Sequence, residues 1–167
     1  MRVLLALLLL CLPGAPLADV WARVVPGDAM YNPELDMAAL VRPDGSFAVV
    51  ICDPDGPGAL VGLGFIAEGY ADRLTSTLRI GGGRVSTRDV AVPELIWRGN
   101  ALDGAVTYLF PISPAEVEMF KAGQSWRVQV GDAALDFPLI GSRAAISAAE
   151  AAKAARAAIL APALQGE

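Results

Sequence analysis

Short apolar stretches separated by turn residues fill the chain from residue 20 to residue 139. In residues 74–80 the side chains alternate, with Leu74, Leu78 and Ile80 on one face and polar residues on the other. A period of two is typical of a β-strand with one buried face. Comparable stretches recur about every ten residues, which indicates an antiparallel β-sandwich or a barrel-like domain. We predict strands at residues 20–25, 37–42, 46–52, 59–67, 74–80, 84–92, 94–98, 105–112, 125–130 and 133–139.

Turn sequences between these stretches support the predicted strands. The Pro-Asp-Gly sequence at residues 43–45 predicts a hairpin turn, because Pro presets φ and Gly accepts a positive φ. Three glycines at residues 81–83 join two strands and lack the spacing of a phosphate-binding loop, so we interpret them as a turn. The Asp-Pro-Asp-Gly-Pro-Gly sequence at residues 53–58 predicts a further turn.

Two helices are predicted in the last third of the chain. Ser113 is placed to cap a short helix at residues 114–122, which has Pro at its first position. Ser142 is placed to cap an Ala-rich helix that runs to about residue 161 and is ended by Pro162. We expect its apolar side to pack on the sheet; a frayed tail and a helix that binds a partner are the alternatives. A helical wheel places a polar stripe at Arg143, Ser147, Glu150 and Lys153, opposite an apolar side at Ala145, Ala148, Ala152, Ala155 and Ile159.

The N-terminal segment has the pattern of a cleavable signal peptide. Arg2 precedes an apolar run at residues 3–12, which is followed by a Pro-Gly pair, Ala18 and the acidic Asp19. Signal peptidase recognises this order, so we predict cleavage between Ala18 and Asp19, with cleavage after Ala15 as the alternative. The apolar run is too short to span a bilayer as a helix.

The predicted organisation is a signal peptide at residues 1–18, a β-sandwich domain at 19–141, and a helix at 142–161 attached to the same domain. Without the signal peptide the chain keeps 149 of its 167 residues, which is a single-domain length. It then has 12 basic and 18 acidic residues, a balance that disfavours nucleic acid and anionic lipid as partners. We expect no stable membrane anchor after cleavage.

Lys occurs only twice in the chain, whereas Arg, Ala, Gly and Pro are abundant. This bias is typical of a GC-rich bacterial genome. Together with the signal peptide, it predicts a periplasmic or secreted protein of a Gram-negative bacterium.

The absence of certain side chains restricts the chemistry. There is no histidine, which excludes the Ser-His-Asp and Cys-His nucleophile systems and most zinc and copper sites. With Cys11 in the signal peptide, Cys52 is the only cysteine of the mature chain, so no intramolecular disulfide or thiolate metal site can form. Cys52 ends an apolar strand, and we predict a buried, unreactive thiol. We predict no cofactor and no bound metal.

Carboxylates are the remaining candidates for catalysis. Asp53 and Asp55 lie in the turn at residues 53–58, which supplies too few oxygens for a calcium site. Glu116 and Glu118 are two residues apart on the predicted short helix, so they point away from each other. A hydrolase or lyase acting on envelope glycans or peptides would use Asp53, Asp55, Glu68 or Asp72.

Aromatic side chains are candidates for contact with a ligand or partner. Trp21 and Trp126 lie in predicted strands, where an aromatic residue most often belongs to the core. The candidates for contact are Tyr31, Tyr70 and Trp97, of which Tyr31 lies in a Pro- and Asn-containing loop and is expected to be exposed.

The second half of the chain resembles the invasion-associated locus B family of bacterial periplasmic proteins. The similar features are a strand that ends in the glycine turn at residues 78–83, a Pro-Ile-Ser step at 111–113, a short helix followed by Gly123, and a strand through Trp126. A Phe-Pro-Leu-Ile-Gly-Ser sequence at residues 137–142 then leads into the Ala-rich helix. The resemblance implies a secreted or periplasmic β-sandwich with accessory, non-catalytic roles, and it carries over no catalytic residue.

These observations favour an exported, non-catalytic accessory or binding protein that engages another envelope or secreted protein, or an envelope component. A hydrolase or lyase that uses carboxylates is one alternative. A structural envelope protein that docks through its C-terminal helix is the other.

Overall fold

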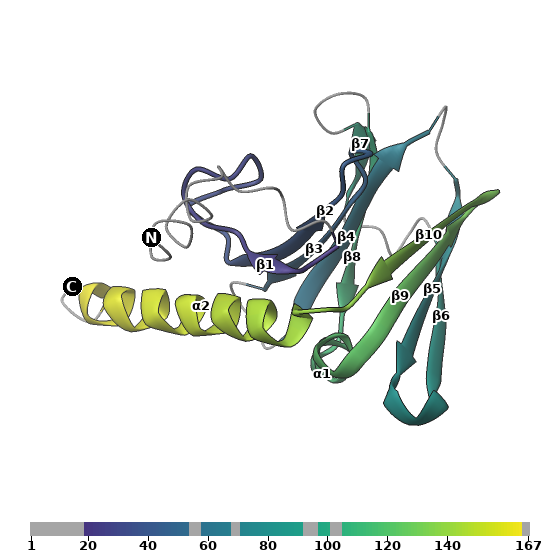
Figure 1. Ribbon diagram of the computed structural model, residues 1–167. Coiled ribbons are helices and arrows are strands. Elements are labelled where there is room, and N and C mark those ends of the chain that lie inside the picture. Colours follow the sequence, from purple (N-terminus) through teal and green to yellow (C-terminus); the bar gives the residue numbers. More distant parts are fainter. Residues whose placement is uncertain (1–18, 54–57, 68–70, 92–96, 101–104, 165–167) are drawn as a thin grey trace, which may run out of the picture.

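The computed structural model describes residues 19–53, 58–67, 71–91, 97–100 and 105–164, and the chain there forms two packed antiparallel sheets with two helices (Figure 1). This confirms the predicted mainly β, sandwich-like fold. The first six strands are β1 (Ala22–Arg23), β2 (Met37–Val41), β3 (Phe47–Cys52), β4 (Ala59–Ile66), β5 (Arg73–Ile80) and β6 (Val85–Ala91). They are followed by β7 (Trp97–Asn100), β8 (Ala105–Ile112), α1 (Pro114–Ala122), β9 (Gly123–Val130), β10 (Ala133–Pro138) and α2 (Ser142–Leu164).

The chain passes back and forth between the two sheets. Sheet A has six strands in the order β1-β2-β3-β4-β8-β7, and sheet B has four in the order β10-β9-β5-β6. Most neighbours are joined by short turns, but β4 pairs with β8 across an excursion of the chain into sheet B. All pairs are antiparallel, as short strands joined by tight turns require.

The predicted turns form where Gly supplies a positive φ. Gly45, in the β2–β3 hairpin, has a φ of 81°, and its N–H donates to the carbonyl of Arg42. Gly82 and Gly83, between β5 and β6, have φ values of 76° and 78°. A side chain at these positions would be strained, because residues with a Cβ rarely adopt this conformation.

The main core lies between the two sheets and is built around Trp126. The indole is fully buried, and its Nε1 donates a 2.9 Å hydrogen bond to Oγ of Ser76 on the neighbouring strand. The ring of Phe120 meets it edge-on at 5.2 Å, and that of Phe137 stacks on it at 5.5 Å. Tyr108 brings a hydroxyl into the core from sheet A, where it accepts a 2.8 Å hydrogen bond from the backbone N–H of Ala71.

Polar contacts join the sheets along two sides of the sandwich. On the β2–β10 side, Arg42 lies over the ring of Phe137 at 4.8 Å and donates to the carbonyl of Asp136. On the β6–β8 side, Arg88 donates to the carbonyl of Pro111 at 3.1 Å and contacts Glu116 at 3.3 Å. Both guanidinium groups therefore bridge the two sheets from partly exposed positions.

Helix α1 begins as the sequence predicts. The hydroxyl of Ser113 accepts from the N–H of Glu116, and the Glu116 carboxylate accepts from the N–H of Ser113, which completes a capping box. Burial opposes ionisation of Glu116, but the hydrogen bonds from Ser113 and Arg88 outweigh it and lower the pKa of this carboxyl below its ordinary value of 4.5.

Helix α2 is three residues longer than predicted and packs with a different side. It continues through Pro162 to Leu164, so Pro162 does not end the helix as predicted. The side that packs on the domain carries Ser142, Ala145, Ile146 and Ala149, all buried. Ala145 was predicted on this side, but three other residues predicted there are exposed: Ala148, Ala155 and Ile159. Glu150 and Lys153, predicted on the exposed side, are half-buried. The predicted orientation of the helix is therefore wrong.

Ion pairs explain why the helix takes this orientation. Nζ of Lys121, on α1, lies 2.7 Å from both the Glu150 and the Glu118 carboxylates. Arg156 pairs with Asp36 just before β2, and it also donates to the carbonyl of Pro33 at 3.0 Å. Because alanine side chains bury little area, a few ion pairs can decide which side of an Ala-rich helix faces the domain.

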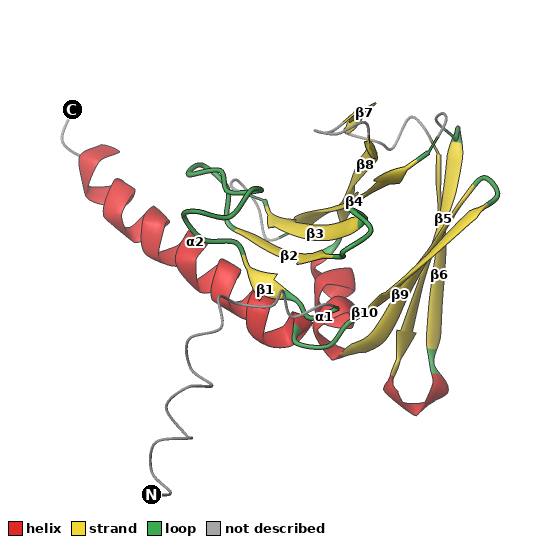
Figure 2. Ribbon diagram, turned by 45° about the horizontal axis from the view of Figure 1, so that its top comes forward, coloured by secondary structure: helices red, strands yellow, loops and turns green. Residues whose placement is uncertain are grey.

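The start of α2 is fixed by a side-chain hydroxyl rather than by a conventional cap. Oγ of Ser142 donates toward the carbonyl oxygens of Phe120 and Leu139, both 2.8 Å away. From this point the helix passes β1, β2 and β3 and continues beyond sheet A, away from sheet B (Figures 1 and 2).

Candidate protein-docking surface

The side of sheet A that faces away from sheet B is apolar across four strands. Because side chains alternate along a strand, every second residue of β2, β3, β4 and β8 points to this side. None of these four strands contains a charged residue. We call the following set the outer face: Met37, Ala39, Val41, Phe47, Val49, Ile51, Leu60, Gly62, Gly64, Thr107, Leu109 and Pro111.

The register aligns the outer face in rows that cross the strands. Ala39 pairs with Val49, Val49 with Gly62, and Gly62 with Leu109. A parallel row runs through Val41, Phe47, Gly64 and Thr107. The same strands also supply the core with Leu40, Val50, Val61, Leu63, Tyr108 and Phe110. Sheet A is therefore apolar on both sides.

Sheet B shows what the exposed side of a sheet in this molecule otherwise looks like. Its central strand β5 presents Thr75 and Thr77 away from the core, and the neighbouring strand β9 presents Arg127 and Gln129. Thr75 and Thr77 are half-buried, and so are Phe47 and Leu109 on the outer face. Met37, Ala39 and Val49 of the outer face are buried in a second hydrophobic cluster, against which Met30 and Leu35 of the β1–β2 loop pack. The part of the outer face that remains half-buried or exposed is apolar, whereas the corresponding side of sheet B is polar.

Two glycines make part of the outer face flat. A Cβ at Gly64 would lie 2.2 Å from Cε1 of Phe47, so the ring lies directly on the backbone of β4. A Cβ at Gly62 would lie 2.9 Å from Val49 and 3.0 Å from Leu109, whose side chains close over this position. The apolar groups therefore form a low, continuous surface instead of separate projecting side chains.

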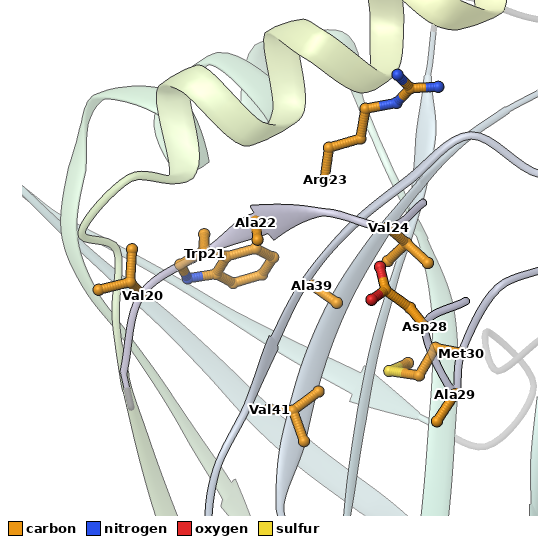
Figure 3. A pocket seen from close by; sticks show the side chains of 10 residues that line it. All are labelled: Val20, Trp21, Ala22, Arg23, Val24, Asp28, Ala29, Met30, Ala39 and Val41. Carbon is orange, nitrogen blue, oxygen red and sulfur yellow. The ribbon is translucent and has the colours of Figure 1, made fainter. Parts of the chain in front are cut away.

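A groove of about 420 Å³ continues the outer face at the β1 edge of the sheet. Figure 3 shows Ala22 and Ala39 side by side in it, with Val20 and Val41 toward one end and Val24 and Met30 toward the other. The groove forms because the Ala22–Ala39 cross-strand pair has only methyl groups between larger neighbours. We call it the β1 groove.

The loop between β1 and β2 is the wall of the β1 groove. Asp28, Ala29 and Met30 line the groove, and the Asp28 carboxylate accepts a 2.7 Å hydrogen bond from the N–H of Val25. Tyr31 follows directly and is 41% exposed, as its loop predicted. It lies beside the wall of the groove, which gives this candidate contact residue a position next to the apolar surface.

The other candidate contact residues have different placements. Tyr70 and the side chain of Trp97 lie outside the described part of the structure, although the backbone of Trp97 begins β7. Trp21 is 3% exposed, and its Nε1 donates to the carbonyl of Pro138 at 2.9 Å, so it belongs to the core together with Trp126. The predicted signal peptide at residues 1–18 also lies outside the described residues.

The candidate catalytic carboxylates are not brought together where they are described. The backbone N–H of Asp53 bonds to Gly58 just before β4 begins, whereas Asp72 follows the far end of β4. Eight residues of β4 separate these positions by about 26 Å. Asp55 and Glu68 lie outside the described residues.

The two helical carboxylates point apart, as predicted. Glu116 faces Arg88, whereas Glu118 faces Lys121. Burial disfavours the charged form of Lys121, but hydrogen bonds to Glu118 and Glu150 outweigh it and raise the pKa of the amine above its ordinary value of 10.5. These groups form ion pairs within the fold, and the described residues contain no cluster of three or more His, Cys, Asp or Glu suited to a metal ion.

Cys52 is buried, as its position at the end of an apolar strand predicts. It is 6% exposed and forms no disulfide. Burial raises the pKa of its thiol to about 11, and the nearby carboxylates of Glu150 and Asp36 act in the same direction. A thiol with this pKa is a poor nucleophile near neutral pH.

The apolar outer face was not predicted from the sequence, although the signal is present. Strands 46–52, 59–67 and 105–112 carry apolar residues at both odd and even positions. A strand that is apolar at both sets of positions predicts a sheet with two apolar sides. In the described residues α1 and α2 pack at the end and edge of the sandwich, and the β1–β2 loop covers part of the outer face by packing Met30 and Leu35 against the buried Met37, Ala39 and Val49.

No protein-family model matches the sequence, and no curated protein matches it either. Among solved structures, the crystal structure of invasion associated protein B from Bartonella henselae is similar to this chain, with a TM-score of 0.56 and 12% sequence identity. The similarity covers 81% of this chain and 95% of that chain. At this identity the likeness concerns the fold, and it agrees with the resemblance noted in the second half of the sequence.

None of the helices in the described residues is both long enough and apolar enough to cross a membrane.

Proposed function

We propose that this chain is an exported, non-catalytic accessory protein that works by binding another protein through the outer face and the adjoining β1 groove. The observation that carries the proposal is the absence of any charged residue from the four strands of the outer face. Exposed apolar patches of a few hundred Å² mark protein interaction sites in otherwise soluble domains. The predicted signal peptide makes an envelope or secreted protein the expected partner.

The chemistry of the surface favours a partner segment that is itself apolar. A flat sheet surface without charges accepts a helix that lays an apolar side across the strands, as in layered architectures. A charged ligand would lose its hydration without gaining an ion pair on these strands. The fold shared with invasion associated protein B of Bartonella henselae is compatible with an accessory role, and it carries no activity over to this chain.

A matched pair of variants tests the proposal. Val41, on the outer face, is 53% exposed, and Val85, on sheet B, is 56% exposed. We expect Val41→Glu to reduce recovery of the partner from the solubilised envelope fraction at least about tenfold, because it places a charge in a desolvated contact. Val85→Glu should capture as much partner as the unmodified protein. Equal recovery by both variants would show that the outer face is not the binding surface.

The absence of catalysis is tested separately. Asp53→Asn and Asp72→Asn each remove one candidate carboxylate and should leave partner capture unchanged. Turnover of an envelope glycan or peptide by the unmodified protein that either substitution abolishes would support the alternative of a hydrolase or lyase.

A structural envelope protein that docks through α2 is the second candidate function. Every exposed residue of this helix from Ala151 to Ile159 is Ala or Ile, and Ile159 is 76% exposed. If this helix is the docking element, Ile159→Glu will abolish capture of an envelope partner while Val41→Glu leaves it intact.

A further inference from the structure

We propose that the β1 groove binds a segment of the partner protein that combines aliphatic side chains with one basic residue, whose cation pairs with the Asp28 carboxylate. This inference rests on the proposed function, because it names the chemistry of the segment that the partner inserts. It concerns only the β1 edge of sheet A, where the chain's own side chains leave a hollow of about 420 Å³.

The floor and both ends of the β1 groove are apolar. Ala22 and Ala39 place methyl groups at the floor, and larger side chains form the ends: Val20, Val41, Val24 and Met30 (Figure 3). Its volume lies within the range of about 300–1,000 Å³ that is typical of ligand pockets. Aliphatic side chains of a partner gain free energy by leaving water for such a groove.

Exposed apolar side chains surround the groove. Val41 is exposed at one end, and Val25 and Tyr31 are exposed next to the wall. Ile140 is also exposed, and its carbonyl accepts from the N–H of Trp21, which lines the groove. Exposed apolar groups that gather around a hollow mark an interaction site, because a partner that fills the hollow also covers its rim.

The wall of the groove is fixed by contacts within the chain. Met30 and Leu35 of the β1–β2 loop pack against the buried cluster that contains Val24. Arg156 of α2 donates to the carbonyl of Pro33 in the same loop at 3.0 Å. A groove whose walls are already ordered binds a partner at a lower entropic cost than one that has to form on binding.

The β1–β2 loop carries negative charge. Residues 24–41 include three acidic side chains, Asp28, Glu34 and Asp36, and no Lys or Arg. Arg156 pairs with Asp36, whereas the exposed carboxylates of Asp28 and Glu34 form no ion pair within the described part of the chain. Charge complementarity therefore favours a basic group on the partner.

Asp28 is the loop carboxylate that lines the groove. Its Oδ2 accepts the N–H of Val25 at 2.7 Å, and Figure 3 shows the carboxylate directed toward the space between Val24 and Ala39. Arg23 also lines the groove, but its guanidinium extends toward α2 in the same view. A cation that enters beside the aliphatic side chains of a partner would meet a carboxylate held in place, and the apolar surroundings strengthen the pair.

Two other occupants fit the groove less well. A lipid acyl chain would take water from the Asp28 carboxylate without supplying a cation. An acidic peptide segment would place two carboxylates beside each other. A segment with aliphatic side chains and one Lys or Arg matches both the apolar floor and the carboxylate.

Selection from a random peptide library displayed on phage tests the charge. We expect peptides selected on the unmodified protein to share aliphatic residues and one Lys or Arg. Asp28→Asn removes the charge but keeps an acceptor for the N–H of Val25, so its peptides should keep the aliphatic residues and lose the basic one. Glu34→Gln is the matched control, because it removes a charge from the same loop outside the groove, and it should leave both preferences unchanged.

Two exposed alanines in edge strands test the position. Ala22→Leu fills the floor of the groove and should weaken binding of a selected, fluorescently labelled peptide at least about tenfold in anisotropy titrations. Ala134→Leu makes the same change in β10, on the polar side of sheet B, and should leave binding unchanged. Circular dichroism confirms that each variant is folded.

Three results would overturn the inference. They are selected peptides without a shared sequence, a preference for a basic residue that survives Asp28→Asn, and equal effects of Ala22→Leu and Ala134→Leu on binding of the selected peptide.

The outcomes also separate this inference from the proposed function. If Val41→Glu abolishes capture of an envelope partner but Asp28→Asn and Ala22→Leu leave capture intact, the partner binds the outer face without a basic segment in the groove, and only this inference fails. If none of the three substitutions reduces capture, both the proposed function and the inference fail.

Discussion

Helix α2 packs on β3, the strand that ends at Cys52, so we expect the Cys52 thiol to report how firmly the helix is held. The thiol is 6% exposed and has charged groups from α2 beside it. Removing the ion pair between Glu150 and Lys121 should loosen the helix without altering the core between the sheets. We therefore predict that Glu150→Gln, which keeps the shape of the side chain, accelerates reaction of Cys52 with a thiol reagent.

The magnitude follows from the exposure of the two partners. The Lys121 side chain is 10% exposed and that of Glu150 is 42% exposed, with 2.7 Å between Nζ and the carboxylate. Because Glu150 keeps much of its hydration, the pair contributes about 1 kcal/mol, the upper end of the range for exposed pairs. If labelling requires transient undocking of α2, a loss of about 1 kcal/mol raises the labelling rate about fivefold.

In the unmodified protein the labelling rate of Cys52 is expected to be low for two reasons. The raised pKa of about 11, against an ordinary 9.0, reduces the thiolate fraction of the docked protein about 100-fold near pH 8. Burial then blocks approach of the reagent. The labelling rate of Cys52 is measured at pH 8 with a chromogenic disulfide, in low and in high salt. Because salt weakens the ion pair, high salt should raise the labelling rate of the unmodified protein toward that of Glu150→Gln.

Glu118→Gln is the matched control. Glu118 lies at the same distance from Lys121, but both residues belong to α1, so this pair does not hold α2. Its removal should change the labelling rate less than about twofold. Equal acceleration by both variants, or none by Glu150→Gln, would refute the assignment of this ion pair to the docking of α2.

Three further measurements examine the fold. Gly64→Ala should lower the free energy of unfolding by about 1–2 kcal/mol in urea titrations, because the added methyl group displaces the ring of Phe47 from the backbone of β4. Gly81→Ala is the control: no atom lies near its added methyl group, so the free energy of unfolding should change by less than about 0.5 kcal/mol. Ser113→Ala removes the capping box and should cost about 1 kcal/mol, measured by thermal unfolding. Because the pKa of Glu116 is lower in the folded protein than its ordinary value of 4.5, the ionised carboxylate stabilises the fold above pH 4.5. This contribution is lost as the pH falls through the pKa of the folded state. Glu116→Gln should therefore make the free energy of unfolding fall less steeply in acid.

Much of the fold follows from local sequence rules. Alternation in residues 74–80, the Pro-Asp-Gly turn at residues 43–45 and the Ser113 cap each predict the element that forms, and predicted strand ends differ from the observed ones by at most three residues. These signals are local because each depends on neighbours a few positions away. Pairing of β4 with β8 could not be derived in this way, since about 40 residues separate the strands.

The candidate site and the orientation of α2 were harder to predict, for different reasons. The outer face was not predicted, because a strand that is apolar at every position gives no indication of which side faces the core between the sheets. The wheel of α2 assigned the alanines to the interior on hydrophobicity alone. The ion pair between Lys121 and Glu150 joins residues 29 positions apart, so it cannot be predicted from the pattern of residues within the helix.

The contacts of Trp21 also have a consequence for the order of folding. Its Nε1 bonds to the carbonyl of Pro138, 117 positions later, and its backbone N–H bonds to the carbonyl of Ile140. β1 can pair with β2 early, but Trp21 makes these contacts only when the end of β10 is available, after about four-fifths of the chain has been synthesised. Such long-range closure makes folding slow and largely post-translational. During that interval the chain remains open, and the export that we propose for this protein would require such an unfolded chain to pass through a narrow channel.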